Sequence, residues 1–179
     1  MELKIGSPKF GRFMGDYFYH QTDDDDKALE YYEKALATKN VWSKADNAIE
    51  KLKIYFNIAM INQKRENWSK MEIAYDSALA QKTLPINKAK VLKYRSNGYV
   101  IANKHKEALA DIDIIIKYKL ASDTVYNDKA RANFALGNVL LAIEDTKEAL
   151  KINPNNPDAK SNLAKLLSLV QTKTITVNK

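Results

Sequence analysis

The sequence predicts an all-α protein, a solenoid of stacked antiparallel helix pairs closed by a C-terminal capping helix. The first observation is a period of 34 residues, which separates Ser96 from Ala130 and Ala108 from Ala142. The second is the scarcity of helix-breaking residues, with 5 glycines and 4 prolines in 179 residues. A repeat of this length is typical of helix pairs that bury their apolar faces against their neighbours.

Mostly small residues recur at regular spacing within each predicted pair, with one extra loop residue in the first pair and Met71 where alanine is usual in the second. Two antiparallel helices approach closely only where side chains are short, which gives the spacing a mechanical reason. The triplets are Gly15/Ala28/Ala35, Ala59/Met71/Ala78, Ser96/Ala108/Ile115 and Ala130/Ala142/Ala149. A filling residue follows the second member of each triplet by four positions: Tyr32, Tyr75, Ile112 and Thr146.

This register places four helix pairs in order along one domain, residues 1–170. The predicted repeats span about 8–41, 52–85, 89–122 and 123–156. Residues 42–51 do not fit the period but remain helix-like, so we expect them to extend the first helix of the second repeat backwards. Pro154 and Pro157 end one helix and open the next.

The predicted capping helix covers residues 158–170. Its apolar residues fall on one face, as expected of a helix that covers the open end of a solenoid: Leu163, Leu166, Leu167 and Val170. Residues 171–179 show no apolar periodicity and are expected to form a flexible tail.

These triplets and their spacing resemble the tetratricopeptide-repeat family over nearly the whole chain. The resemblance implies a right-handed superhelix in which the first helix of each pair lines a concave groove that holds a segment of another protein. An unrelated helical bundle with a chance spacing is the alternative.

Composition and motifs favour a binding protein over an enzyme. The formal net charge is +7, which attracts acidic partners at long range. His20 and His105, the only histidines, have no partner at metal-ligand or catalytic spacing, and there are no cysteines. We therefore expect no catalytic residues, no metal, no cofactor and no small-molecule substrate. With no apolar run long enough to cross a membrane, the chain is expected to be cytoplasmic.

The run Asp23 to Asp26 lacks the alternating ligands and the turn glycine of a calcium loop. We interpret it as a solvated turn whose acids lie at the N-terminal end of the next helix, where they favour the helix dipole.

The register also predicts which side chains face the groove. They are Lys9, Arg12, Phe13, Asp16, Tyr19, Lys53, Phe56, Asn57, Met60, Lys64, Lys90, Lys93, Tyr94, Asn97, Ile101, Asn127, Asp128, Arg131 and Phe134. Seven of them are basic and two are acidic, so the groove is expected to attract an acidic segment. The expected peptide-binding residues are Arg12, Asp16, Lys53, Asn57, Lys64, Lys90, Lys93, Tyr94 and Arg131.

The groove is similar to that of chaperone-binding co-chaperones, including the large immunophilins. In those proteins a carboxylate clamp of Lys, Asn, Asn, Lys and Arg holds the C-terminal Glu-Glu-Val-Asp of heat-shock chaperones. The resemblance assigns clamp positions to Arg12, Asn57 and Lys90. Asp16 stands where an asparagine donor belongs, and Tyr94 replaces the final arginine, although Arg95 is adjacent. The clamp is therefore incomplete.

Three other functions stay open at this stage. The chain can serve as an assembly scaffold through its convex face, its capping helix or its tail, with no chaperone link. Its basic balance also suits nucleic acid, although no recognised nucleic-acid motif is present. An enzymatic role ranks last.

Overall fold

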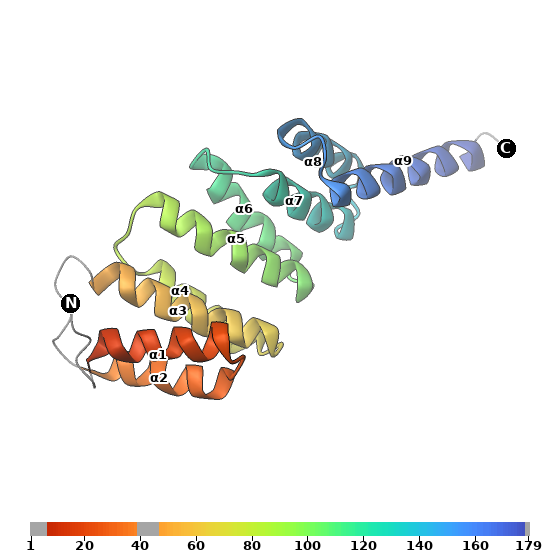
Figure 1. Cartoon of the computed structure of the whole chain (residues 1–179). Coiled ribbons are helices and arrows are strands. Elements are labelled where there is room, and N and C mark those ends of the chain that lie inside the picture. Colours follow the sequence, from red (N-terminus) through yellow and green to blue (C-terminus); the bar gives the residue numbers. More distant parts are fainter. Residues whose placement is uncertain (1–6, 39–46, 178–179) are drawn as a thin grey trace. The chain divides into compact units, whose positions relative to one another are not determined.

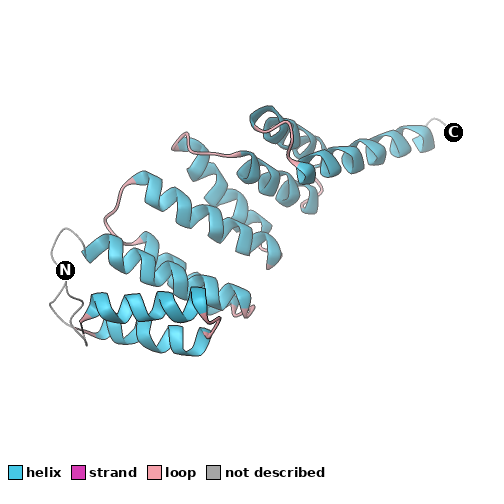
Figure 2. Cartoon of the chain, viewed as in Figure 1, coloured by secondary structure: helices cyan, strands magenta, loops and turns pink. Residues whose placement is uncertain are grey.

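The structure is a computed structural model that describes residues 7–38 and 47–177. These residues form nine helices and no strands (Figures 1 and 2). No helix in this part of the chain is long and apolar enough to cross a lipid bilayer. The chain divides into two compact units, Met1–Leu84 and Pro85–Lys179, where the sequence suggested a single domain over residues 1–170.

The first unit contains two helix pairs. Helix α1 (Pro8–Gln21) packs against α2 (Asp25–Ala37), and α3 (Asn47–Lys64) packs against α4 (Trp68–Leu79). Side chains of α2 and α3 share one core, which joins the two pairs. Its buried members are Ala28, Tyr32, Ala35, Ile54 and Ile61.

The second unit contains two further pairs and the capping helix. They are α5 (Pro85–Ile101), α6 (His105–Lys117), α7 (Asp123–Ala135), α8 (Val139–Ile152) and α9 (Pro157–Val177). Helices α5 and α6 form one pair, α7 and α8 form the next, and α7 also contacts both helices of the pair before it. Helix α9 packs on α8.

The predicted register of small residues is confirmed within each unit. Every member of the four triplets is buried, and so are the four filling residues. Gly15 shows why the spacing is strict, because a Cβ atom added there would lie within 3.0 Å of three ring carbons of the buried Tyr32. A side chain at this position would push α1 away from α2.

Local signals set the helix boundaries. The Ser7 hydroxyl accepts a hydrogen bond from the Phe10 amide at 3.2 Å, and the Asp24 carboxylate accepts one from the Lys27 amide at 3.0 Å. Both are N-caps that satisfy amides without a partner inside the helix. The turn that connects the two helices of each pair contains one residue with positive φ, in order Asp23, Glu66, Asn103 and Gly137.

Several predicted boundaries need correction. Helix α3 begins at Asn47, which confirms the backward extension for residues 47–51, whereas residues 42–46 lie outside the described part. Helix α5 begins at Pro85, four residues before the expected start of the third repeat. Proline suits the first turn of a helix because the amide that it lacks would have no helical partner there.

The capping helix was correctly placed but its length was wrong. Helix α9 continues to Val177, so most of the segment expected to be a loose tail is helical, and residues 178–179 lie outside the described part. Leu163, Leu166 and Val170 pack with Ala142 and Ile143 of α8, as the apolar face predicted. Leu167, which was assigned to the same face, is exposed instead.

Candidate peptide-binding site

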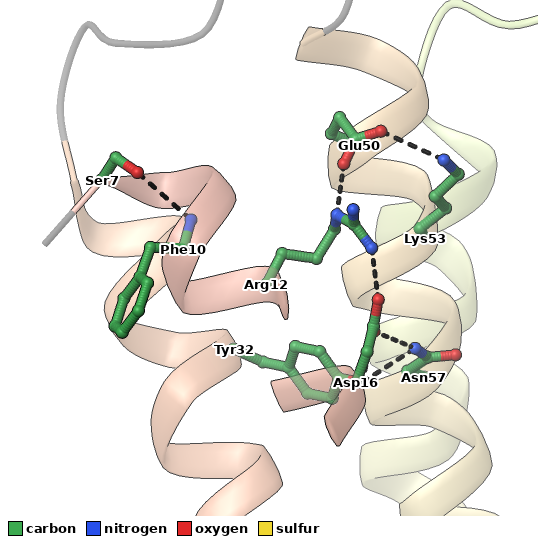
Figure 3. A network of polar contacts seen from close by, with 8 residues as sticks. All are labelled: Ser7, Phe10, Arg12, Asp16, Tyr32, Glu50, Lys53 and Asn57. Carbon is green, nitrogen blue, oxygen red and sulfur yellow. Dashed lines mark hydrogen bonds and ion pairs between the residues drawn. The ribbon is translucent and has the colours of Figure 1, made fainter. Parts of the chain in front are cut away.

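In the first unit, the predicted groove residues of α1 and α3 bind one another. We call this cluster the Asp16 network; it comprises Arg12, Asp16, Tyr32, Glu50, Lys53 and Asn57 (Figure 3). The Asp16 carboxylate accepts hydrogen bonds from the Tyr32 hydroxyl at 2.8 Å and the Asn57 amide at 3.0 Å. It also forms an ion pair with Arg12. Three donors therefore converge on a single carboxylate.

The Asp16 network uses the donors that the clamp resemblance assigned to a peptide. The amide nitrogen of Asn57 carries two hydrogens; one is directed to Asp16 and the other to the Tyr32 oxygen at 2.8 Å. Burial and the nearby Asp16 charge raise the pKa of Tyr32, so its hydroxyl stays a donor. Asp16 thus engages both Arg12 and Asn57 within the unit.

Glu50 is the residue of this network that the sequence analysis missed. Its carboxylate forms ion pairs with Arg12 and, at 3.1 Å, with Lys53. Glu50 lies in the stretch 42–51, which was outside the repeat register and so was not counted in the groove. Its position three residues before Lys53 on a helix was the available signal.

Lys64, the second predicted groove cation of α3, binds the aspartate run. Its ammonium lies 2.7 Å from Asp23 and 3.2 Å from Asp25, and Arg65 lies 2.9 Å from Asp26. The acids of the run lie at the N-terminal end of α2, as predicted, and Asp24 is its N-cap. The hydrogen bond from the Lys27 amide lowers the pKa of Asp24. The interpretation of the whole run as a solvated turn was incomplete, because the run joins α2 to the end of α3.

In the second unit, α5 and α7 enclose a hollow of about 300 Å³, which we call the α5–α7 cleft. Its lining consists of Lys93, Tyr94, Asn97, Thr124, Asn127, Asp128, Arg131 and, from the start of α9, Asp158. Lys90 lines an adjoining hollow that shares Lys93 and Tyr94 with the cleft. Three of the predicted peptide-binding residues, Lys93, Tyr94 and Arg131, are therefore brought to one cleft.

The electrostatics of the α5–α7 cleft are mixed. Burial raises the pKa of Asp128, although Arg131, Asn97 and Lys93 act in the opposite direction. The Arg131 guanidinium contacts Asp128 through one nitrogen at 3.2 Å, and its side chain remains 45% exposed. A guanidinium has five N–H donors, so this single contact leaves donors for a further acceptor.

Arg95 lies next to the clamp position occupied by Tyr94, but it binds elsewhere. Its Nε and Nη2 atoms donate to the Asp111 carboxylate of α6 at 2.7 and 2.6 Å. The pair is largely buried. Arg95 therefore does not replace the missing clamp arginine.

The two histidines lie in the last turn of α1 and at the start of α6. His20 is exposed and lies beside Tyr19, with ring centroids 4.7 Å apart and ring planes tilted by 55°, and His105 begins α6. Within residues 7–38 and 47–177, no three His, Asp or Glu side chains are grouped to hold a metal ion.

The architecture defines a class of helical-hairpin repeat proteins. The family model described as tetratricopeptide repeat matches residues 14–40 and 123–156. These two segments therefore match tetratricopeptide repeats. Stacked helical repeats of this kind form extended concave surfaces that such proteins use for binding. No match was found among curated protein sequences.

Several solved structures share this fold. The first tetratricopeptide domain of Spaghetti (RPAP3), bound to the HSP90 peptide SRMEEVD, is 19% identical; the match covers 68% of this chain and 94% of that domain, with a TM-score of 0.61. A tetratricopeptide repeat protein from Parabacteroides merdae is also 19% identical, with a TM-score of 0.74. That match covers 89% of this chain but only 58% of the other. MamA from Desulfovibrio magneticus is 11% identical over 92% of this chain and 96% of its own length, with a TM-score of 0.67.

Proposed function

We propose that the chain is a protein-interaction module that binds an acidic, extended peptide in the α5–α7 cleft of its second unit. The observation that supports this most is the pairing of Lys93 and Arg131 across the cleft beside the amides of Asn97 and Asn127. Cations neutralise acidic side chains or a C-terminal carboxylate, and amides both donate to and accept from a peptide backbone.

The contrast between the two units supports this choice of site. Arg12, Lys53 and Lys64 already bind carboxylates of their own unit. A peptide would have to displace Asp16, Glu50 or Asp23 to reach them. Arg131, by contrast, is 45% exposed and contacts Asp128 through one nitrogen. We therefore assign Arg12 and Asn57 to the stability of the first unit.

We base the proposed partner class on the cations of the cleft and on the ligand of one structurally similar protein. The first tetratricopeptide domain of Spaghetti binds a peptide ending in Glu-Glu-Val-Asp. A chaperone C-terminus of this kind is one acidic peptide that we propose for the α5–α7 cleft. We expect micromolar affinity, about −8 kcal/mol, that weakens as salt increases.

Fluorescence anisotropy with labelled SRMEEVD tests the proposal. Lys93→Glu and Arg131→Glu should each weaken binding by about tenfold or more, because a charge-assisted hydrogen bond contributes about 1.5–3 kcal/mol. Lys147→Glu is the matched control, since it makes the same charge change at an exposed position of α8. Equal affinities for wild type, Lys93→Glu and Lys147→Glu would exclude the cleft.

A second candidate function is scaffolding through the outer helices. Leu140 and Leu141 begin α8 and are 70% and 49% exposed, and adjacent exposed apolar residues favour a protein contact. Leu140→Glu should then abolish a stable complex in a co-purification assay without changing SRMEEVD affinity. Retention of the complex by this variant would remove the second candidate.

A further inference from the structure

A second hollow opens between α7 and α9, and its chemistry differs from that of the α5–α7 cleft. We call it the α7–α9 pocket; its volume is about 360 Å³. Apolar side chains form most of its wall, among them Phe134, Leu166 and Leu169. Leu166 is buried, whereas Phe134 and Leu169 are 47% and 42% exposed. Covering these two side chains would remove apolar surface from water, which is favourable.

The α7–α9 pocket adjoins the α5–α7 cleft, because the two hollows share one lining residue. Arg131 lines both hollows. Asn162 of α9, which lines the pocket, donates a hydrogen bond at 2.9 Å to Asn127 of α7, which lines the cleft. The two helices that form the pocket are thus held together at its border with the cleft.

The rim of the α7–α9 pocket is basic. Arg131 lies on the side of the cleft, and Lys165 lies on α9. Both side chains are exposed, and an apolar hollow between two cations complements a large apolar side chain with acidic neighbours.

We propose that the α7–α9 pocket receives one large apolar side chain of the same acidic peptide that occupies the α5–α7 cleft. This inference rests on the proposed function and makes it more specific. The ligand class becomes an acidic segment that contains an apolar anchor such as leucine, methionine or phenylalanine. Carboxylates bind Arg131 and Lys93, and the anchor covers Phe134 and Leu169.

A second copy of the chain fits the pocket less well. In a two-fold contact each residue of the patch faces the same patch on the partner. Arg131 and Lys165 would then approach their own copies, and each chain carries a net charge of +7. Like charges at a contact oppose association, so the rim favours an acidic peptide over self-association.

The experiment measures the binding of two sets of labelled, glutamate-rich, ten-residue peptides to the full chain by fluorescence anisotropy. In one set a single leucine is placed at each position in turn, and in the other set alanine replaces that leucine. At the best position, leucine should increase wild-type affinity by about tenfold over alanine, the discrimination typical of an apolar pocket.

Variants separate the pocket from the cleft. Phe134→Ala and Leu169→Ala should each reduce the leucine preference to about twofold or less and bind the alanine peptide as the wild type does. Leu140→Ala, at an exposed leucine of α8, should keep the full preference. Circular dichroism and thermal unfolding confirm that each variant is folded.

The outcomes distinguish failure of this inference from failure of the proposed function. If leucine and alanine peptides bind the wild type equally but Lys93→Glu weakens both, the pocket is excluded and the cleft stands. A leucine preference that survives both pocket variants also overturns the inference. If neither peptide binds and light scattering shows a dimer that Leu169→Ala dissociates, the pocket is a self-association site and both proposals fail.

Discussion

Arg95 and Asp111 form a two-point ion pair between α5 and α6, with nitrogen–oxygen distances of 2.7 and 2.6 Å. The Arg95 and Asp111 side chains are only 13% and 5% exposed. A planar guanidinium matches a carboxylate in this geometry, which a lysine cannot reproduce. The pair therefore fixes the second unit's first helix pair and leaves Tyr94 to face the cleft.

Breaking this pair should strongly destabilise the protein. Arg95→Ala leaves a buried carboxylate without its partner, so we expect the free energy of unfolding to fall by about 3–5 kcal/mol. Urea denaturation followed by circular dichroism measures the loss. The double variant Arg95→Met/Asp111→Leu should recover most of it, because no charge is then buried. A double variant as unstable as the single one would contradict this account.

Arg12 should matter for stability and not for peptide binding. Its guanidinium pairs with Asp16 and Glu50, and all three side chains are partly buried. Arg12→Ala should lower the free energy of unfolding by about 1–2 kcal/mol. Its affinity for SRMEEVD should stay within about twofold of wild type, since variants outside the contact surface change binding little.

The control for Arg12 is Lys34→Ala, which removes an exposed pair with Glu30 on α2. This variant should leave the free energy of unfolding close to that of wild type, because solvent screens an exposed ion pair. If Arg12→Ala reduced peptide affinity as much as Lys93→Glu, Arg12 would belong to the binding site after all.

Gly15 tests the packing of α1 on α2. Alanine is normally the better helix residue by about 1 kcal/mol, so an open position would gain stability from Gly→Ala. At Gly15 the added methyl meets the Tyr32 ring, whose hydroxyl is held by Asp16 and Asn57. We expect a loss of about 1–3 kcal/mol in the free energy of unfolding, as for other overpacked cores.

Gly137→Ala provides the comparison for Gly15. Nothing lies within 4 Å of the added methyl, but the backbone φ of 82° is unfavourable for alanine. Its cost of about 1 kcal/mol should come from the backbone alone. Thermal unfolding that shows Gly15→Ala to be more stable than wild type would rule out the close approach to Tyr32.

Asp128 should make peptide binding depend on pH. Burial raises its pKa, so the folded protein holds this proton more tightly than the unfolded chain does. The charged carboxylate therefore destabilises the folded state at neutral pH, and this penalty disappears as pH falls through the raised pKa. The same protonation removes a negative charge from the α5–α7 cleft and should favour an acidic peptide.

Asp128→Asn should bind SRMEEVD about two- to fivefold more tightly than wild type at pH 7, the range for a partly screened charge. The advantage should shrink as pH is lowered through the raised pKa of Asp128, because the wild-type carboxyl then becomes neutral. The ratio of the two affinities cancels the titration of the peptide's own carboxylates. A ratio that is constant between pH 7 and 4 would show that Asp128 does not influence the site.

The sequence alone determined the helix pairs and their contacts. The burial of Ala28, Ala108 and Ala142 was readable because closely packed helices need short side chains at regular positions. The predictions from the sequence that were wrong in the described chain concern local features, such as the length of α9 and the exposure of Leu167. Both features depend on how much of a helix end packs against other elements, which the periodicity of apolar residues does not encode.

Only the tertiary structure decided which charges remain available. The sequence-based prediction counted Arg12, Lys64 and Arg131 alike as cations available to a peptide. Folding brings Glu50 to Arg12 and Asp23 to Lys64, pairs separated by 38 and 41 residues along the chain. An ion pair depends on distances of a few ångströms between such segments, so residue spacing could not predict that the first unit neutralises its own cations.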